Sequence, residues 1–321
     1  MMTRRWMGIA AIVALEIVPS NGARGQSYPE RIIEMVLPGT PGNSADIVGR
    51  VLMEGMSKEL GQHLVAINKP GAGGVVATSA VAQAKPDGYT LLHGAVWTLT
   101  VAPLTELHTA YTRKSFDPIC QTFKNDQVIV AKPNTYRNVA ELIASNKAKS
   151  GGLNYGTPGI GTIPHLAMVE LSQMAHTEFN QVPFRSTTDS LQMTLAGQVD
   201  FAVAPLTSSA NSNLAMLGLF AAKRNPLIPD VPTLVEQGFN VSPLSIGGVF
   251  APAGIPTDVR GKLEAACMAA MQTDAFKLMA KNTFQPSDFN GNSHVFTSNI
   301  DKDAQEKQRL LTALGMVKTQ P

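Results

Sequence analysis

Short apolar runs alternate with amphipathic segments along most of the chain, and this alternation predicts its secondary structure. Apolar runs bounded by glycine, proline or asparagine are typical of buried strands, and they occur at 32–37, 63–68, 90–93, 116–122, 127–131, 153–157, 179–183, 199–204 and 249–251. Apolar residues recur at helical spacing in segments 46–60, 75–84, 138–150, 162–174, 187–196, 258–271, 275–281 and 295–314. This strand–helix alternation predicts an α/β protein with parallel sheets and crossover helices.

Two of the predicted strand–helix junctions carry glycine-rich loops. The first reads PGTPGNSAD over 38–46 and the second reads GTPGIGTIPHL over 156–166. Glycine lets the backbone take positive φ values and approach a ligand closely, and Thr162 is expected to cap the following helix. Free N–H groups at a helix start favour an anion. We therefore predict one anion-binding cleft lined from two lobes.

The candidate ligand residues of the first loop are Thr40, Pro41, Gly42, Asn43, Ser44, Ala45 and Asp46. Those of the second loop are Thr157, Gly159, Ile160, Gly161, Thr162 and His165. Two of these residues have a structural alternative. Asp46 either takes part in ligand binding and loop ordering or only complements the helix dipole, and His165 either recognises the anion or donates to loop carbonyls.

Composition and charge narrow the class of protein. With 321 residues, of which 44% are hydrophobic and 16% charged, the chain is long enough for two packed domains. A net charge of +2 gives no reason to expect nucleic acid as a partner.

Residues 1–25 combine Arg4 and Arg5 with an apolar run over 6–18 and small residues near 23–25. We interpret them as a secretory signal peptide, which implies an exported protein.

The chain has two cysteines, Cys120 and Cys267, and both lie in the part expected to be exported. An oxidising compartment permits them to form a disulfide. Two buried free thiols fit the sequence equally well.

Sequence motifs for catalysis are absent, so no catalytic residue, metal or cofactor is predicted. The chain has no Gly-x-Ser-x-Gly, Walker, His-Glu-x-x-His or Cys-x-x-Cys motif, and its six histidines lack metal-ligand spacing. The glycines of 71–74 suggest a dinucleotide site, but Val76 replaces the third glycine and Pro70 lies in the turn. An enzyme assembled from distant residues and a sensor that presents its ligand to a membrane receptor remain alternatives to a transport protein.

A series of motifs carries a family resemblance. The motifs are Tyr28-Pro29, NKPGAGG at 68–74, PDGYTLL at 86–92, the loop 155–166, VPF at 182–184, GQVD at 197–200, DVPT at 230–233 and FAPAG at 250–254. Together they resemble the periplasmic substrate-binding proteins of tripartite tricarboxylate transporters, the Bug family. They cover essentially the whole mature chain in order.

The resemblance implies a two-lobed periplasmic binding-protein fold of the type II-like, flytrap kind, with a ligand cleft between two α/β domains. Lobe 1 would comprise 26–124 and 246–321, and lobe 2 would comprise 125–245, so that the chain crosses between them twice. Members of the family hold a carboxylate through backbone N–H groups, hydroxyls and waters of the two loops. The implied protein is a monomer that captures a small carboxylated solute and delivers it to multispanning membrane transporter subunits.

Departures from the family pattern concern the side chains of the pocket. Arg185-Ser186 stands where the family usually has Lys-Gly, Asp189 replaces a small residue or proline, and Ile246 replaces an aromatic residue. The ligand is therefore not inherited from the family.

Five further side chains are added to the site, namely Trp97, Arg185, Ser186, Asp189 and Pro205. Arg185 either binds a carboxylate through both nitrogens or pairs with Asp189 four residues on. Trp97 either stacks on the ligand or fills the base of its lobe.

Overall fold

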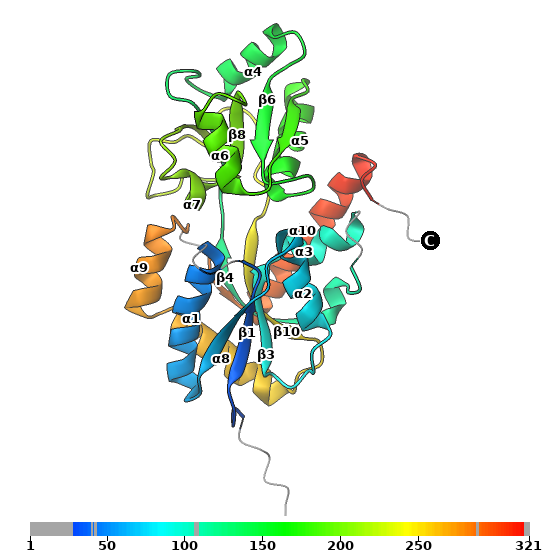
Figure 1. Ribbon diagram of the computed structural model, residues 1–321, viewed down its shortest axis with the longest axis vertical. Coiled ribbons are helices and arrows are strands. Elements are labelled where there is room, and N and C mark those ends of the chain that lie inside the picture. Colours follow the sequence, from blue (N-terminus) through cyan, green and yellow to red (C-terminus); the bar gives the residue numbers. More distant parts are fainter. Residues whose placement is uncertain (1–27, 40, 42–43, 106–108, 287–288, 318–321) are drawn as a thin grey trace, which may run out of the picture.

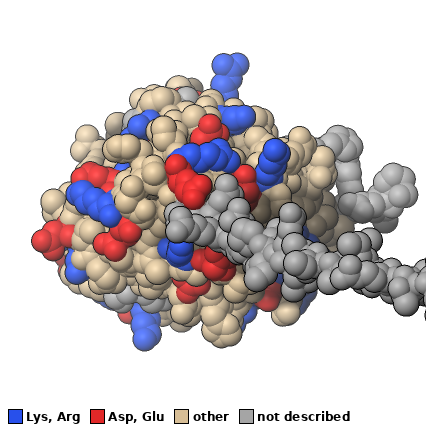
Figure 2. Space-filling view, turned by 90° about the horizontal axis from the view of Figure 1, so that it is seen from below, with Lys and Arg blue, Asp and Glu red and all other residues tan. Residues whose placement is uncertain are grey.

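The computed structural model describes residues 28–317 except 40, 42–43, 106–108 and 287–288. The predicted signal peptide and the candidate residues Thr40, Gly42 and Asn43 lie outside the described residues. Within the described ranges, no helix combines the length and apolar character needed to cross a membrane. On the face seen in Figure 2, acidic and basic side chains are interspersed.

Two β-sheets, each covered by helices, form two lobes stacked along the long axis of the molecule (Figure 1). The first sheet has the order β11-β4-β10-β3-β1-β2 and consists of β1 (Ile33–Leu37), β2 (Leu64–Asn68), β3 (Thr90–Ala95), β4 (Phe116–Lys124), β10 (Ile246–Pro252) and β11 (Gly291–Asn292). The second has the order β7-β6-β8-β5-β9 and consists of β5 (Gln127–Ala131), β6 (Asn154–Thr157), β7 (Asn180–Pro183), β8 (Phe201–Pro205) and β9 (Ala215–Phe220). The predicted two-lobed α/β fold is confirmed.

The expectation of parallel sheets holds only in part. Strands β1, β2 and β3 are parallel, but β10 is antiparallel to both β3 and β4. In the second sheet, β5 is antiparallel to β8 and β9. The reason is the path of the chain between the sheets. No crossover helix separates β4 from β5, and β10 returns from the second lobe, so it runs opposite to β3, which points toward that lobe.

The chain passes between the sheets after Lys124 and again before Ile246. The exact lobe boundaries, with 26–124 and 246–321 in one lobe and 125–245 in the other, stay a prediction. Strand β9 is absent from the predicted strands, and so is the short strand β11.

The predicted helices all occur, with ends that agree within two residues. They are α1 (Ser44–Leu60), α2 (Val75–Ala82), α4 (Val139–Ala148), α5 (Ile163–Ala175), α6 (Thr187–Leu195), α8 (Thr257–Ala270), α9 (Asp274–Asn282) and α10 (Ser293–Ala313). Two short helices are missing from the prediction, α3 (Trp97–Thr100) and α7 (Leu206–Ser209). Both are single turns at strand ends, too short for a periodic pattern.

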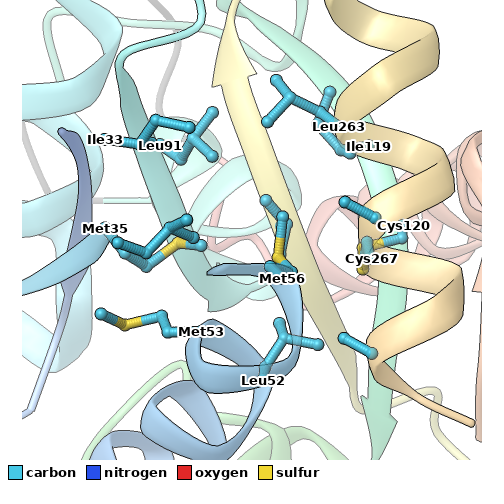
Figure 3. Close-up of a cluster of buried hydrophobic side chains, with 14 of the residues drawn as sticks. Ile33, Met35, Leu52, Met53, Met56, Leu91, Ile119, Cys120, Leu263 and Cys267 are labelled. Carbon is cyan, nitrogen blue, oxygen red and sulfur yellow. A yellow bond between two sulfur atoms is a disulfide. The ribbon is translucent and has the colours of Figure 1, made fainter. Parts of the chain in front are cut away.

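A buried cluster between the first sheet and helices α1 and α8 forms the largest core of lobe 1 (Figure 3). Met56 of α1 and Leu263 of α8 are fully buried in it. Cys120 of β4 and Cys267 of α8 are bonded as a disulfide inside this cluster. The disulfide, which the sequence left open, thus links the sheet to its covering helix.

Candidate functional site

The carboxyl ends of the parallel strands of each lobe point toward the other lobe, as β1 and β6 do in Figure 1. In open α/β sheets, ligands bind outside these strand ends. In lobe 2, strand β6 lies between β7 and β8. Thr157 is the register partner of Pro183. The loops after β6 and β7 and the end of β8 at Pro205 are therefore neighbours.

The loop after β6 is held by a buried threonine. Thr157 is fully buried, and its Oγ1 accepts a hydrogen bond of 2.7 Å from Nε2 of Gln181 on β7. The same Gln181 nitrogen lies 3.2 Å from the carbonyl oxygen of Gly159. Gly159 and Gly161 have φ values of 140° and 77°, and Ile160 between them is 68% exposed. The turn thus exposes one apolar side chain to solvent.

Thr162 takes the N-cap position of α5 but does not cap the helix through its side chain, which corrects the prediction. Its hydroxyl donates to the carbonyl oxygen of Gly159 at 2.7 Å. Because that hydroxyl donates its hydrogen inside the loop, the threonine stabilises the turn instead of an N–H group of the helix.

His165 is bonded to the loop backbone, as its structural alternative expects, but as an acceptor and not as a donor to loop carbonyls. Its Nδ1 accepts the N–H of Gly161 at 3.0 Å. Burial lowers the pKa of His165, which favours the neutral ring. Since Nδ1 is an acceptor, Nε2 carries the proton of the neutral ring. Direct recognition of an anion by His165 stays a prediction.

Backbone donors remain at the start of α5. The N–H of Gly161 is taken by His165, whereas those of Ile160, Thr162 and Ile163 have no acceptor within the described part of the chain. Pro164 follows and has no N–H. Such donors, with the positive end of the helix dipole behind them, suit a carboxylate.

In the loop after β1, Asp46 orders the backbone. It is buried, its Oδ2 accepts from Nε of Arg50 at 2.8 Å, and its Oδ1 accepts from Nδ2 of Asn68 at 2.9 Å. Nδ2 of Asn68 also donates to the carbonyl oxygen of Gly39 at 2.8 Å. These bonds support the loop-ordering interpretation of Asp46 and give it partners beyond the helix dipole. A ligand contact stays a prediction.

The structure records no ligand-related contact for the other described candidates of this loop. Pro41 is exposed. Ser44 and Ala45 begin α1, and their side chains are outside the described part of the structure. The structure therefore does not bring the two loops together into one described ligand site.

Among the added side chains, Ser186 and Trp97 have structural partners. Ser186 is the N-cap of α6, and its Oγ accepts from the N–H of Asp189 at 3.1 Å. Trp97 is half-buried and packs against two apolar clusters, which favours the core interpretation. Its ring lies against the turn at Gly73, where an added Cβ would come within 2.5 Å of it.

Arg185 is exposed just beyond β7. The alternative in which it pairs with Asp189 is wrong, because no described acidic side chain lies within ion-pair distance of its guanidinium. Arg185 is thus available to an anion. Pro205 ends β8, and its carbonyl oxygen accepts the hydroxyl of Ser209 at 3.0 Å.

Sequence reasoning missed Asn68 and Gln181, which order the two loops. A polar side chain inside or at the end of a strand pattern is a signal that could have found them.

Sequence reasoning also missed His93, which is fully buried. It lines a small cavity of about 60 Å³ together with Val48, Phe123, Asn125, Thr207, Thr283 and Gln285. Burial lowers the pKa of His93 to about 4, and its Nε2 lies 2.9 Å from Oγ1 of Thr122. The cavity lies between the lobes, since Thr207 follows β8 and His93 lies on β3.

No group of three or more histidine, cysteine, aspartate or glutamate side chains with metal-binding geometry occurs within the described ranges. Nothing in the described geometry therefore indicates a metal centre.

Comparison with known proteins bears on this site. Residues 48–316 match the model of a family described as "Tripartite tricarboxylate transporter family receptor". The chain is 34% identical to a UPF0065 protein of Bordetella pertussis over 283 residues, which are 86% of this chain and 87% of that protein.

Two solved structures share the fold. The periplasmic binding protein BugD is 28% identical with a TM-score of 0.77, and the match covers 91% of this chain and all of BugD. R. palustris Rpa4515, solved with adipate, is 24% identical with a TM-score of 0.81, and the match covers 90% of this chain and 99% of that protein. These matches confirm the resemblance seen in the sequence motifs.

Proposed function

Because this chain belongs to the tripartite tricarboxylate transporter receptor family, we propose that it is a periplasmic binding protein for a small carboxylated solute. It captures the solute between its lobes as a monomer and delivers it unchanged to the membrane subunits of a tripartite transporter. The observation that carries this proposal is the start of α5. There a glycine turn offers N–H groups that have no acceptor among the described residues, at the positive end of a helix dipole.

The second loop supports a carboxylate more than a neutral ligand. Its N–H groups are donors only, and no carboxylate of the chain occupies them within the described residues. The neutral His165 is already committed to Gly161 through Nδ1 and leaves Nε2–H as one further donor. Adipate in the R. palustris protein of the same fold is consistent with a carboxylate in such a cleft.

Binding without chemistry is the simplest use of this arrangement. The proposed site contains a backbone turn, a neutral histidine and an exposed arginine, with no nucleophile paired to a base among its described residues. The family match also favours a binding protein over an enzyme.

The test of this function is a thermal-shift screen of the mature protein against mono-, di- and tricarboxylates and aromatic acids. We expect one class of acid to raise the melting temperature. Mass spectrometry of the acid recovered after long incubation should return it unmodified. A chemically altered product, or no response to any carboxylate, would contradict the proposal. Uptake into proteoliposomes that contain the membrane subunits tests delivery.

Arg185→Ala is expected to weaken the binding of dicarboxylates about tenfold or more and to leave monocarboxylates nearly unchanged. A hydrogen bond to a charged group contributes about 1.5–3 kcal/mol, and the backbone donors of the second loop still hold the first carboxylate. Isothermal titration calorimetry with paired mono- and dicarboxylates measures the difference. Lys277→Ala, which removes an exposed positive charge on α9, is the matched control for net charge. Equal losses for both acids would argue against selectivity at Arg185.

A further inference from the structure

The lobes also touch at α10, away from the two chain segments, 125–126 and 221–245, that join them. Leu310 and Leu311 of α10 form a buried cluster with Val101, which follows α3, and Leu166 of α5. Helix α10 contacts α3 and β4 of lobe 1, whereas α5 follows β6 of lobe 2. In Figure 1 the end of α10 rises toward the lobe that carries α5. Helix α10 therefore bridges from the first lobe to the second.

Charged side chains are buried beside this apolar cluster. Lys307 is 0% exposed and Asp303 is 1% exposed, although both lie on α10. Oδ2 of Asp303 accepts the hydroxyl of Thr100 at 2.6 Å. Within the described residues, neither Nζ of Lys307 nor Oδ1 of Asp303 has a hydrogen-bond partner. The carboxylate of Glu306 lies 3.7 Å from Nζ of Lys307 and is half exposed.

A buried ammonium group needs compensating charge, because removing it from water is costly. Asp303 and Glu306 of the same helix supply part of this charge, and the other lobe supplies a further candidate. Glu170 lies one helical turn after Leu166 on α5, and Lys307 lies one turn before Leu311 on α10. Residues four apart share a helix face, so both charges lie on the faces that meet in the cluster. Burial raises the pKa of Glu170, and the electrostatic effect of Lys307 opposes that increase.

Among the described residues no ion pair joins Lys307 of α10 to Glu170 of α5. We propose that their opposite charges nevertheless attract each other across the lobes and act as an interlobe latch, which holds the start of α5 at its working distance from the first lobe. The effect of this latch on ligand binding rests on the proposed function. Lys307 itself contacts no ligand. It is a positioning residue that acts through α5, whose first turn carries the unused N–H groups.

The latch has a defined response to charge removal. If Glu170 loses its charge, Lys307 keeps only Asp303 and Glu306 of its own helix as compensation. If Lys307 loses its charge, Glu170 stays half-buried without the opposite charge across the lobes. Either loss favours separation of the lobes. Removing both charges takes away the attraction together with the desolvation cost. The double variant should then be no worse than either single variant, and the two effects should not add.

The experiment uses the mature protein without ligand and compares Glu170→Gln, Lys307→Met and their combination by small-angle X-ray scattering and amide hydrogen exchange. Each single variant is expected to increase the radius of gyration and to speed exchange in α5 and the second half of α10. The double variant is expected to match a single variant. Glu306→Gln is the matched control, because it removes an acid close to Lys307 without crossing the lobes.

The affinity measurement gives the second readout. Each single variant should weaken binding of the acid found for wild type about tenfold. The double variant should also lose about tenfold, which is about ten times less than the product of the two single losses. Additive effects, unchanged scattering and exchange, or an equal response to Glu306→Gln would overturn the latch. If the wild-type protein binds no carboxylate, the proposed function fails, while scattering and exchange still decide the latch. Glu170→Gln keeps the shape of a half-buried side chain. If Lys307→Met does not fold, the Glu170→Gln variant alone still tests the latch.

Discussion

The protein with Cys120→Ala and Cys267→Ala is expected to lose about 3–5 kcal/mol of its free energy of unfolding. The two cysteines are 147 residues apart in sequence, and a disulfide that closes a long loop restricts the unfolded chain strongly in the loop-entropy model. Both cysteines are fully buried between β4 and α8, so the substitution also removes packing. This is the largest stability effect that we expect from any pair of side chains in the protein.

Urea unfolding followed by circular dichroism measures this loss through the transition midpoint and slope. The reduced wild-type protein is the control, because it keeps both sulfur atoms and lacks only the bond. It should lose most of the same free energy. If reduction leaves the midpoint unchanged, the bond does not contribute to stability in solution and the buried packing alone carries this part of the core.

Gly161→Val is expected to lower the affinity for the bound acid at least tenfold, which corresponds to about 1.4 kcal/mol. Gly161 has a φ of 77°, a conformation that costs a branched residue about 1–3 kcal/mol. Valine would force the turn to change, and the N–H groups of Ile160 and Thr162 would move with it. Calorimetric titration with the acid identified for the wild type gives the affinity.

Gly197→Val is the matched control for this prediction. Gly197 has the same φ of 77°, and an added Cβ meets no atom within 4 Å at either position. Gly197 follows α6, at the end of that helix away from Ser186. Both variants should lose similar stability, but only Gly161→Val should lose affinity. If Gly161→Val binds as tightly as wild type while Arg185→Ala loses every acid, the anion does not lie on the second loop.

The regular strands and helices of the fold were predictable because the spacing of apolar residues within each segment indicates its secondary structure. Strand β5 begins and ends at the predicted residues 127 and 131. The start of β10 and all of β9 escaped because glycines interrupt their apolar runs. At Gly247 an added Cβ would come within 2.4 Å of the carbonyl oxygen of Gly94. The close approach of the two strands therefore requires glycine here, although a glycine in an apolar run usually indicates that a strand ends.

The candidate site was only partly predictable. The glycine turn and the start of α5 follow from adjacent residues, and they are present as expected. The partners that hold them come from other elements. Gln181 reaches Thr157 from β7, and Asn68 reaches Asp46 from β2. A sequence without structure does not show which polar side chains meet across strands, and it also did not reveal that the Thr162 hydroxyl turns back to Gly159.

The position of β10 between β3 and β4 sets an order of assembly. The second sheet uses one continuous stretch, Gln127–Phe220, whereas the first sheet is complete only after Ile246–Pro252 has joined it. A chain that emerges from its amino end can therefore finish the second lobe while β3 and β4 still lack the strand between them. Unpaired strand edges associate readily with other chains. We therefore expect a newly made molecule to be most exposed to aggregation in the period before residue 252 emerges.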